Sequence, residues 1–305
     1  MEIGSIILTI VGLSLFEIIN SVDNAVINAE VLGHVGPKAR RWFLVWGIFI
    51  AVFLMRGLLP WFIIYFTNPS LGFIGALTAT FSADPAIAAS IEESAPVLLV
   101  GAAVFLIFLF LHWLFLEPKT YGLHTERFFE KQGVWFYAFV SIILATIVWY
   151  SLKRNPLMAF SAVIGSCAFF ITHGFKQNAE KVEHDMIHDK GRMSDISKLI
   201  YLEVIDATFS IDGVLGSFAF TFSIILILIG NGIGALVVRK LTISNIESVK
   251  KYKYLKNGAM YSILFLGVLM LLESFGREIP GFVAPIVTIG VLGYFFYKSK
   301  RELKE

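Results

Sequence analysis

The sequence contains a single cysteine, Cys167, which lies in an apolar run of the 305-residue chain. One cysteine excludes a disulfide framework and a thiolate metal cluster within the chain. The net charge is also small, at +2, which is too little to indicate nucleic-acid binding. The N-terminus, Met1-Glu2-Ile3, lacks the basic region of a signal peptide, so we expect it to begin a first membrane helix.

Three kinds of catalytic signature are missing as well. The sequence has no phosphate-binding loop, no nucleophile triad and no zinc-protease motif. We therefore expect no enzymatic activity and no tightly bound cofactor. An ATP-driven mechanism would need a separate subunit.

Apolar residues are abundant. They make up 57% of the chain, with 29 phenylalanines, and the mean hydropathy is +0.76. An ordinary soluble domain is about 45–50% apolar. The composition therefore predicts an all-α, polytopic membrane protein whose main partner is the lipid bilayer.

A membrane helix needs about 20 apolar residues. The sequence predicts nine such spans, at 3–32, 42–66, 97–116, 134–152, 156–175, 198–220, 223–239, 258–276 and 281–298. Segment 67–96 is rich in small residues, Pro and Glu, and we expect it to be an extramembrane or re-entrant loop.

The basic residues fix an orientation for these spans. With nine spans, 20 of the 25 Lys and Arg lie on one side and 3 on the other, while Arg56 and Arg239 fall inside helices. Cytoplasmic loops carry the excess of Lys and Arg. We therefore expect the N-terminus outside, the C-terminus in the cytoplasm, and a bacterial inner membrane as the location.

Two segments of the chain repeat one motif. Glu17, Ser21 and Asp23 of the first span have the same spacing as Asp206, Ser210 and Asp212 of the sixth. When the serines are superposed, each acid of one motif corresponds to an acid of the other. The copies lie five spans apart, so they cross the membrane in opposite directions. Inverted repeats are typical of secondary transporters, with the binding site near the midplane.

The repeat also divides the chain. We expect one transmembrane domain over 1–305, with a first half at 1–116 and a second half at 198–305. Connecting helices and a charged cytoplasmic loop at 117–197 join the halves.

Buried carboxylates need a function, because one at a helix centre costs about 2.5–3.5 kcal/mol on insertion scales. Residues i and i+6 point about 120° apart on a helix, so both acids of a motif can face one small site only if the helix is broken beside its serine or lies between two cavity walls. The predicted metal ligands are Glu17, Asn20, Ser21, Asp23, Asn24, Glu203, Asp206, Ser210 and Asp212. Oxygen ligands suit Mg²⁺, Ca²⁺ or Mn²⁺, and neither motif contains the His or Cys that suit Zn²⁺ or Cu⁺.

The motif acids and two further acidic residues have two interpretations each. The motif acids bind metal, or they form buried ion pairs with Arg56 and Arg239. Asp84 lines an outer gate, or it caps a short helix that begins at the next residue. Glu273 carries protons, or it is a structural acid.

Asn231 is a further candidate for coupling or gating. His184 and His188, spaced i and i+4, share a metal in a cytoplasmic sensor site, or they belong to a solvated charged helix.

The two motifs, Glu17-x3-Ser21-x-Asp23-Asn24 and Asp206-x2-Phe209-Ser210-x-Asp212, resemble the paired motifs of the TerC family, named for tellurium resistance. Further agreement lies at 218–221, Asn231, Arg239, 254–258 and 279–280, so the resemblance covers most of 5–66 and 198–298. It implies efflux of manganese or a related cation, with the motif acids as ligands. Gly267-Val268-Leu269-Met270 lacks the Lys of the family's Gly-x-Lys-Met pattern, which indicates a divergent branch.

Together these features predict a secondary transporter that exports a divalent cation, Mn²⁺ first, with proton exchange as a natural coupling. One alternative is a transporter of tellurium oxyanions or a basic amino acid. Another is a non-transporting membrane scaffold in a metal or tellurite stress complex. Homo-oligomer formation and stress-response partners stay open.

Overall fold

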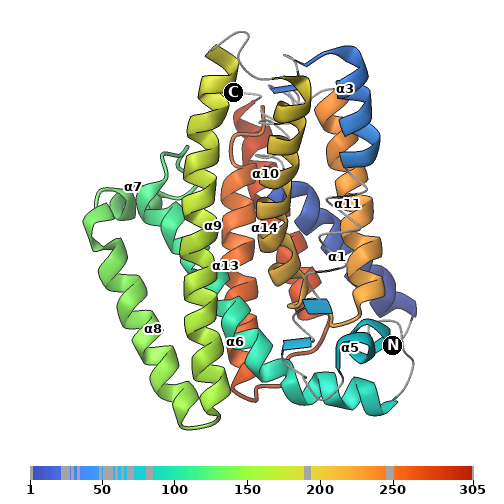
Figure 1. Ribbon diagram of the computed structural model, residues 1–305. Helices are drawn as coiled ribbons and strands as arrows, with labels where there is room; N and C mark the ends of the chain where they lie inside the picture. Colours follow the sequence, from blue (N-terminus) through green and yellow to red (C-terminus); the bar gives the residue numbers. More distant parts are fainter. Residues whose placement is uncertain are drawn as a thin grey trace.

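The computed structural model describes residues 3–21, 28, 31–32, 35–47, 50, 58, 61–62, 65–66, 72–79, 85–188, 194–244 and 251–303. Within these residues the protein is a bundle of helices without a strand (Figure 1). The long helices are α1 (Ile3–Asn20), α6 (Pro85–Leu116), α8 (Phe136–Leu152), α9 (Pro156–His188), α10 (Asp195–Ser217), α11 (Ile224–Ser244), α13 (Leu255–Ser274) and α14 (Val283–Glu302). The short ones are α3 (Pro37–Trp42), α5 (Gly72–Ala79) and α7 (His124–Glu130), with a π-helical turn at Phe43–Gly47 and a 3₁₀ turn at Gly133–Trp135.

Among the described residues, five helices are long and apolar enough to cross a membrane. They are Ile3–Asn20, Glu93–Leu116, Gly133–Leu152, Pro156–Asn178 and Leu255–Ser274, and Ile224–Val238 is a shorter apolar helix. Each coincides with a predicted span, and α10 and α14 occupy two more. The protein is therefore an all-α, polytopic integral membrane protein, as predicted. The predicted span 42–66 lies largely outside the described residues, so the count of nine stays a prediction.

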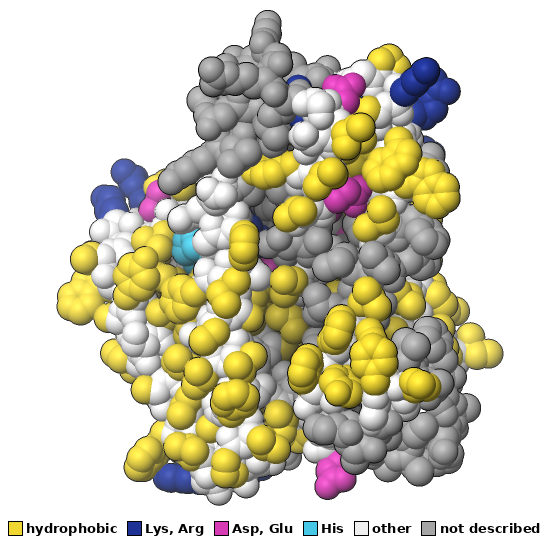
Figure 2. Space-filling model, viewed as in Figure 1, with side chains coloured by type: hydrophobic (Ala, Val, Ile, Leu, Met, Phe, Trp, Pro, Cys, Tyr) yellow, Lys and Arg dark blue, Asp and Glu magenta, His cyan; other side chains and the backbone are white. Residues whose placement is uncertain are grey.

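The membrane helices differ in how much of their surface is buried inside the protein. The apolar stretch of α6 is 83% buried inside the protein, whereas that of α8 is only 17% buried. Large apolar side chains such as Ile142 and Trp149 of α8 are more than half exposed. Figure 2 shows hydrophobic side chains over much of the surface, with Lys and Arg gathered mainly toward the ends. Such a surface is suited to lipid rather than to water.

The helix α6 packs against α9 and α13. Small residues bring α6 and α9 together, because a Cβ added at Gly101 would lie 2.5 Å from Ser161 Oγ, and one added at Gly165 would collide with the backbone of Gly101. Membrane helices commonly use such small residues to bring backbones close. Two phenylalanine rings of α6, Phe105 and Phe108, then meet Phe169 of α9 edge-on.

The first helix, α1, packs against α11 and α14. A Cβ at Gly230 would lie 2.6 Å from Leu13 Cβ, and one at Gly12 would lie 2.9 Å from Pro285 Cβ. α1 also contacts α10, where the ring of Phe16 fills the space beside Gly216. The two helices that carry the repeated motif are therefore neighbours.

Segment 67–96 is not the loop that hydropathy predicted. The helix α5 forms within it, and α6 begins at Pro85 and continues without interruption to Leu116. Proline is favoured at the first helical position and alanine throughout a helix, so the first turns of α6 form outside the most apolar stretch. Pro96 lies inside α6, where a proline removes a backbone hydrogen bond. Figure 1 shows α6 bent, with its first turns crossing the lower edge of the bundle.

The charged segment 176–198 is also mostly helical rather than a loop. α9 continues to His188, and α10 begins at Asp195 after Ser194, whose hydroxyl oxygen accepts a backbone hydrogen bond. Hydropathy shows where apolar residues end, whereas Lys, Glu and Ala sustain a helix beyond that point. Lys176, assigned to a cytoplasmic loop by the sequence, consequently lies inside α9.

Candidate functional site

The acid of the first motif, Glu17, is buried between helices, with 1% of its surface exposed. Ser21 Oγ donates a hydrogen bond of 2.5 Å to Glu17 Oε1. On α11, Gly234 leaves room for this side chain, because a Cβ there would lie 2.6 Å from Glu17 Cβ. The glycine therefore lets a carboxylate fit at a close helix contact.

The first motif helix ends where a break was predicted. α1 stops at Asn20, and Ser21 lies in a turn. Asp23 and Asn24, predicted as ligands, lie outside the described residues, as does Asp84.

The second motif helix is continuous, so of the two arrangements that the spacing allows, a break beside Ser210 is not the one observed. α10 remains helical from Asp195 to Ser217. Ser210 Oγ donates to the carbonyl of Asp206 at 2.7 Å, which satisfies the hydroxyl within its own helix. The two motif acids of α10, Asp206 and Asp212, therefore point in different directions, as their spacing requires on an intact helix.

Each acid of α10 has its own partner. Asn28 Nδ2 donates a hydrogen bond of 2.8 Å to Asp206 Oδ1. Asp212 Oδ2 lies 2.5 Å from Lys176 Nζ of the neighbouring helix α9, and the side chains of this pair are 5% and 14% exposed. The other oxygen, Asp212 Oδ1, is buried and has no hydrogen-bond partner among the described residues.

A buried ion pair was one of the two interpretations of the motif acids, but the partner of Asp212 is a lysine and not an arginine. The sequence suggested Arg56 and Arg239, of which Arg56 and the side chain of Arg239 lie outside the described part of the chain. Lys176 was missed because it directly follows an apolar run, where a lysine usually marks the end of a span. Its burial against α10 depends on helix packing, which no sequence signal of this chain indicates.

The remaining predicted residues lie elsewhere in the fold. The carboxylate of Glu203 lies against Gly47 of the π-helical turn. Asn231 of α11 is fully buried, and its Nδ2 donates a hydrogen bond of 2.9 Å to Ser217 Oγ of α10. Glu273 lies in the last turn of α13 rather than deep in its span. Asn231 therefore ties α11 to the C-terminal end of α10, beside the motif.

The structure does not bring three potential ligands together within the part of the chain that it describes. No group of three or more His, Cys, Asp or Glu side chains converges there as a metal site would require. Because Asp23 lies outside this part, a metal site shared by both motifs stays a prediction. His184 and His188 both lie on α9, and their side chains are outside the described residues.

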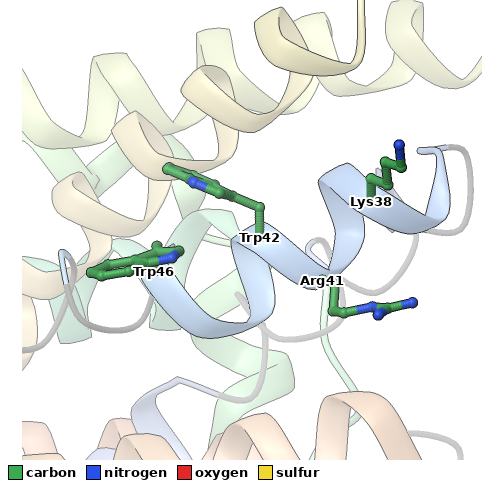
Figure 3. A pocket seen from close by; sticks show the side chains of 4 residues that line it. All are labelled: Lys38, Arg41, Trp42 and Trp46. Carbon is green, nitrogen blue, oxygen red and sulfur yellow. The ribbon is translucent and has the colours of Figure 1, made fainter.

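A pocket of about 390 Å³ lies on the surface, lined by Lys38, Arg41, Trp42 and Trp46 (Figure 3). We call it the α3 pocket. Two basic and two aromatic side chains do not suit a metal cation, so this pocket is separate from the acidic residues of α1 and α10.

Comparison with known proteins finds a family whose profile matches most of the chain. The profile of a family described as "Protein of unknown function (DUF475)" matches residues 22–305. "Uncharacterized membrane protein RP786" of Rickettsia prowazekii (strain Madrid E) is 31% identical over 94 residues, which is 31% of this chain and 31% of that protein. The match thus spans about a third of the relative's length. No solved structure matches the chain.

Proposed function

The chain belongs to the DUF475 family, and we propose that it is a secondary transporter that exports a divalent metal cation, Mn²⁺ first, through the carboxylates of α1 and α10. The observation that carries the proposal is the burial of Glu17 and Asp212, which are 1% and 4% exposed. A carboxylate inside a membrane helix costs about 2.5–3.5 kcal/mol, and such residues usually mark an ion or proton pathway.

The repeat supports the same proposal. The two motif helices contact each other, and their acids have the same spacing in opposite halves of the chain. Inverted repeats of this kind are the basis of alternating access in secondary transporters. The resemblance of both motifs to the TerC family favours a hard divalent cation over other substrates.

The alternatives fit the chemistry less well. A site for a tellurium oxyanion needs positive charge, whereas both motifs supply carboxylates. A basic amino acid or a scaffold role in a stress complex leaves the oxygen-rich ligand set without a specific explanation. The bacterial inner membrane, with the N-terminus outside and the C-terminus in the cytoplasm, is part of the proposal, and the orientation rests on the asymmetry of Lys and Arg between the loops.

Mn²⁺ binding and transport by the purified, full-length protein test the proposal. Wild-type protein in liposomes should move Mn²⁺, and Glu17→Gln should abolish binding and transport while changing the melting temperature little. The amide keeps the shape of the side chain and its hydrogen bond from Ser21, but it removes the charge that the metal needs.

Glu93→Gln, which removes an exposed carboxylate of α6, is the control and should behave as wild type. Wild-type protein that neither binds nor moves Mn²⁺, Ca²⁺ or Mg²⁺ would overturn the proposal.

A further inference from the structure

We propose that Lys176 is a tethered competitor of the metal cation, which occupies Asp212 when no metal is bound. The inference rests on the proposed function, because it concerns how the same carboxylate is filled between transport events.

The ammonium group of Lys176 donates a charge-assisted hydrogen bond directly to the carboxylate of Asp212. Lys176 Nζ lies 2.5 Å from Asp212 Oδ2, and both side chains are largely buried. Divalent cations sit about 2.0–2.6 Å from carboxylate oxygens. The free oxygen, Asp212 Oδ1, has no hydrogen-bond partner among the described residues, so the carboxylate retains capacity for another ligand.

The ammonium group and a metal ion exclude each other from this position. Two cations at one carboxylate repel strongly where water is scarce, because the local dielectric constant is low. Lysine differs from an immobile counter-ion, since its charge is a point at the end of a flexible four-carbon stem. The side chain can therefore leave the carboxylate without any change in the backbone of α9.

The competition has a measurable consequence for affinity. Lys176→Met keeps the length of the side chain and removes its charge, so it should strengthen Mn²⁺ binding by about tenfold or more, as expected for a charge pair in direct contact. Lys176→Gln should act in the same direction, and its amide still donates a hydrogen bond to Asp212, which guards against misfolding.

Lys298→Met is the matched control. Lys298 is another partly buried lysine, which donates to the carbonyl of Gly122 and belongs to α14. Its removal should leave the Mn²⁺ affinity unchanged, measured by titration of the full-length protein in detergent.

The double variant Lys176→Met/Asp212→Asn should fold, because it leaves no buried charge uncompensated, and it should not bind Mn²⁺. Unchanged or weaker Mn²⁺ binding by both Lys176→Met and Lys176→Gln would overturn the role of Lys176 and leave the proposed function intact. Absence of Mn²⁺ binding in the wild type and in both single variants would overturn the proposed function itself.

We also propose that the α3 pocket binds the headgroup of an anionic phospholipid. The opposite face of this segment is fixed to the bundle, because Phe43 is buried in a cluster with Leu199 and Leu202 of α10. Trp42 and Trp46 therefore point outward, and they are 46% and 54% exposed.

The chemistry and the place of the pocket fit a lipid headgroup. Figure 1 shows α3 at the same end of the bundle as the C-terminus, and Figure 3 shows the two tryptophans and the two basic residues lining the pocket from one short segment. Tryptophan is enriched at the level of the headgroups. Lys38 and Arg41 supply positive charge that attracts anionic lipids. Such lipids give the cytoplasmic surface of a membrane its negative potential.

Nanodiscs that contain phosphatidylcholine and phosphatidylglycerol test this second proposal. The wild type should retain more phosphatidylglycerol than phosphatidylcholine when the bound lipids are counted by native mass spectrometry. Lys38→Gln/Arg41→Gln should lose this preference about tenfold or more.

Lys153→Gln/Arg154→Gln provides the control. These exposed residues, with Lys153 Nζ 5.0 Å above the ring of Trp149, form a basic and aromatic surface between α8 and α9. This variant removes the same charge and should retain the preference. Equal retention by all three proteins, or equal loss by both variants, would overturn a specific site on α3.

Discussion

At the end of α6, the carboxylate of Glu117 lies between the side chains of His112 and Lys256. Glu117 Oε1 is 3.3 Å from His112 Nδ1, and Oε2 is 3.1 Å from Lys256 Nζ. Burial of the carboxyl group acts to raise its pKa, but the hydrogen bond with His112 and the charge of Lys256 outweigh burial and lower the pKa of Glu117 to about 2. The ionised form of Glu117 therefore stabilises the junction of α6 and α13.

This pKa predicts how stability depends on pH. Because the pKa of Glu117 is lower in the folded protein than the ordinary value of 4.5, its contribution is present above about pH 4.5 and is lost as the pH falls toward 2. Glu117→Gln should lower the melting temperature at pH 7 and reduce the loss of stability between pH 5 and 3 (roughly the titration range).

Glu278→Gln, at an exposed position between α13 and α14, is the control for this measurement. Identical melting temperatures of Glu117→Gln and the wild type at pH 7 would contradict the prediction.

The residues of the candidate site show what a sequence can and cannot predict at this scale. The repeat identified Glu17 and Asp212 as buried acids, because a matched spacing in two apolar segments is a strong pattern. It did not identify Lys176 as the partner of Asp212, since the identity of a neighbour across α9 and α10 depends on how the helices pack. The assignment of Asp23 as a ligand stays a prediction.

At the scale of helices, hydropathy located the apolar spans well and the helix ends poorly. The span predicted at 134–152 agrees with Gly133–Leu152. The helices α6 and α9 extend beyond their apolar stretches, because polar and small residues that leave the hydrocarbon still favour helix. The extension of α9 matters for function, because it places Lys176 on a rigid element beside α10.

The contact between α6 and α9 depends on glycine. Gly165→Ala would drive a Cβ into the backbone of Gly101, which has no flexible atom that can move aside. We expect a loss of about 1–3 kcal/mol of stability, as for other overpacked contacts, measured as a lower melting temperature in detergent.

Gly174→Ala is the matched control, because it makes the same change on the same helix with no atom within 4 Å of the new Cβ. It should match or exceed the wild type in melting temperature, since alanine favours helix over glycine. A Gly165→Ala protein as stable as Gly174→Ala would show that α6 and α9 do not pack as closely as described.

At the scale of the whole molecule, the two ends of the chain lie at opposite ends of the bundle (Figure 1). An odd number of crossings requires this arrangement, and the predicted count is odd. The charge asymmetry of the loops predicts that the C-terminal end is the cytoplasmic one.

Accessibility of introduced cysteines tests this orientation. In a Cys167→Ser background, Glu93→Cys should react with a membrane-impermeant thiol reagent in intact cells, whereas Arg301→Cys should react only after permeabilisation. Both positions are exposed, and the first turns of α6 and the C-terminal end of the chain lie toward opposite ends of the bundle (Figure 1). The reverse labelling pattern would contradict the orientation.

The pairing of Lys176 with Asp212 has an electrical consequence for a protein in an energised membrane. A membrane potential does work only on net charge that moves, and one elementary charge crossing the whole potential is worth about 2.3 kcal/mol per 100 mV. The ammonium and the carboxylate of the pair, 2.5 Å apart, cancel each other, so helices that carry them together move without electrical work. In the proposed metal-bound state, a divalent ion in place of the lysine would give the carboxylate and its ion together a net positive charge. A membrane potential would therefore do work on the movement of the metal-bound carboxylate but not on that of the lysine-paired carboxylate.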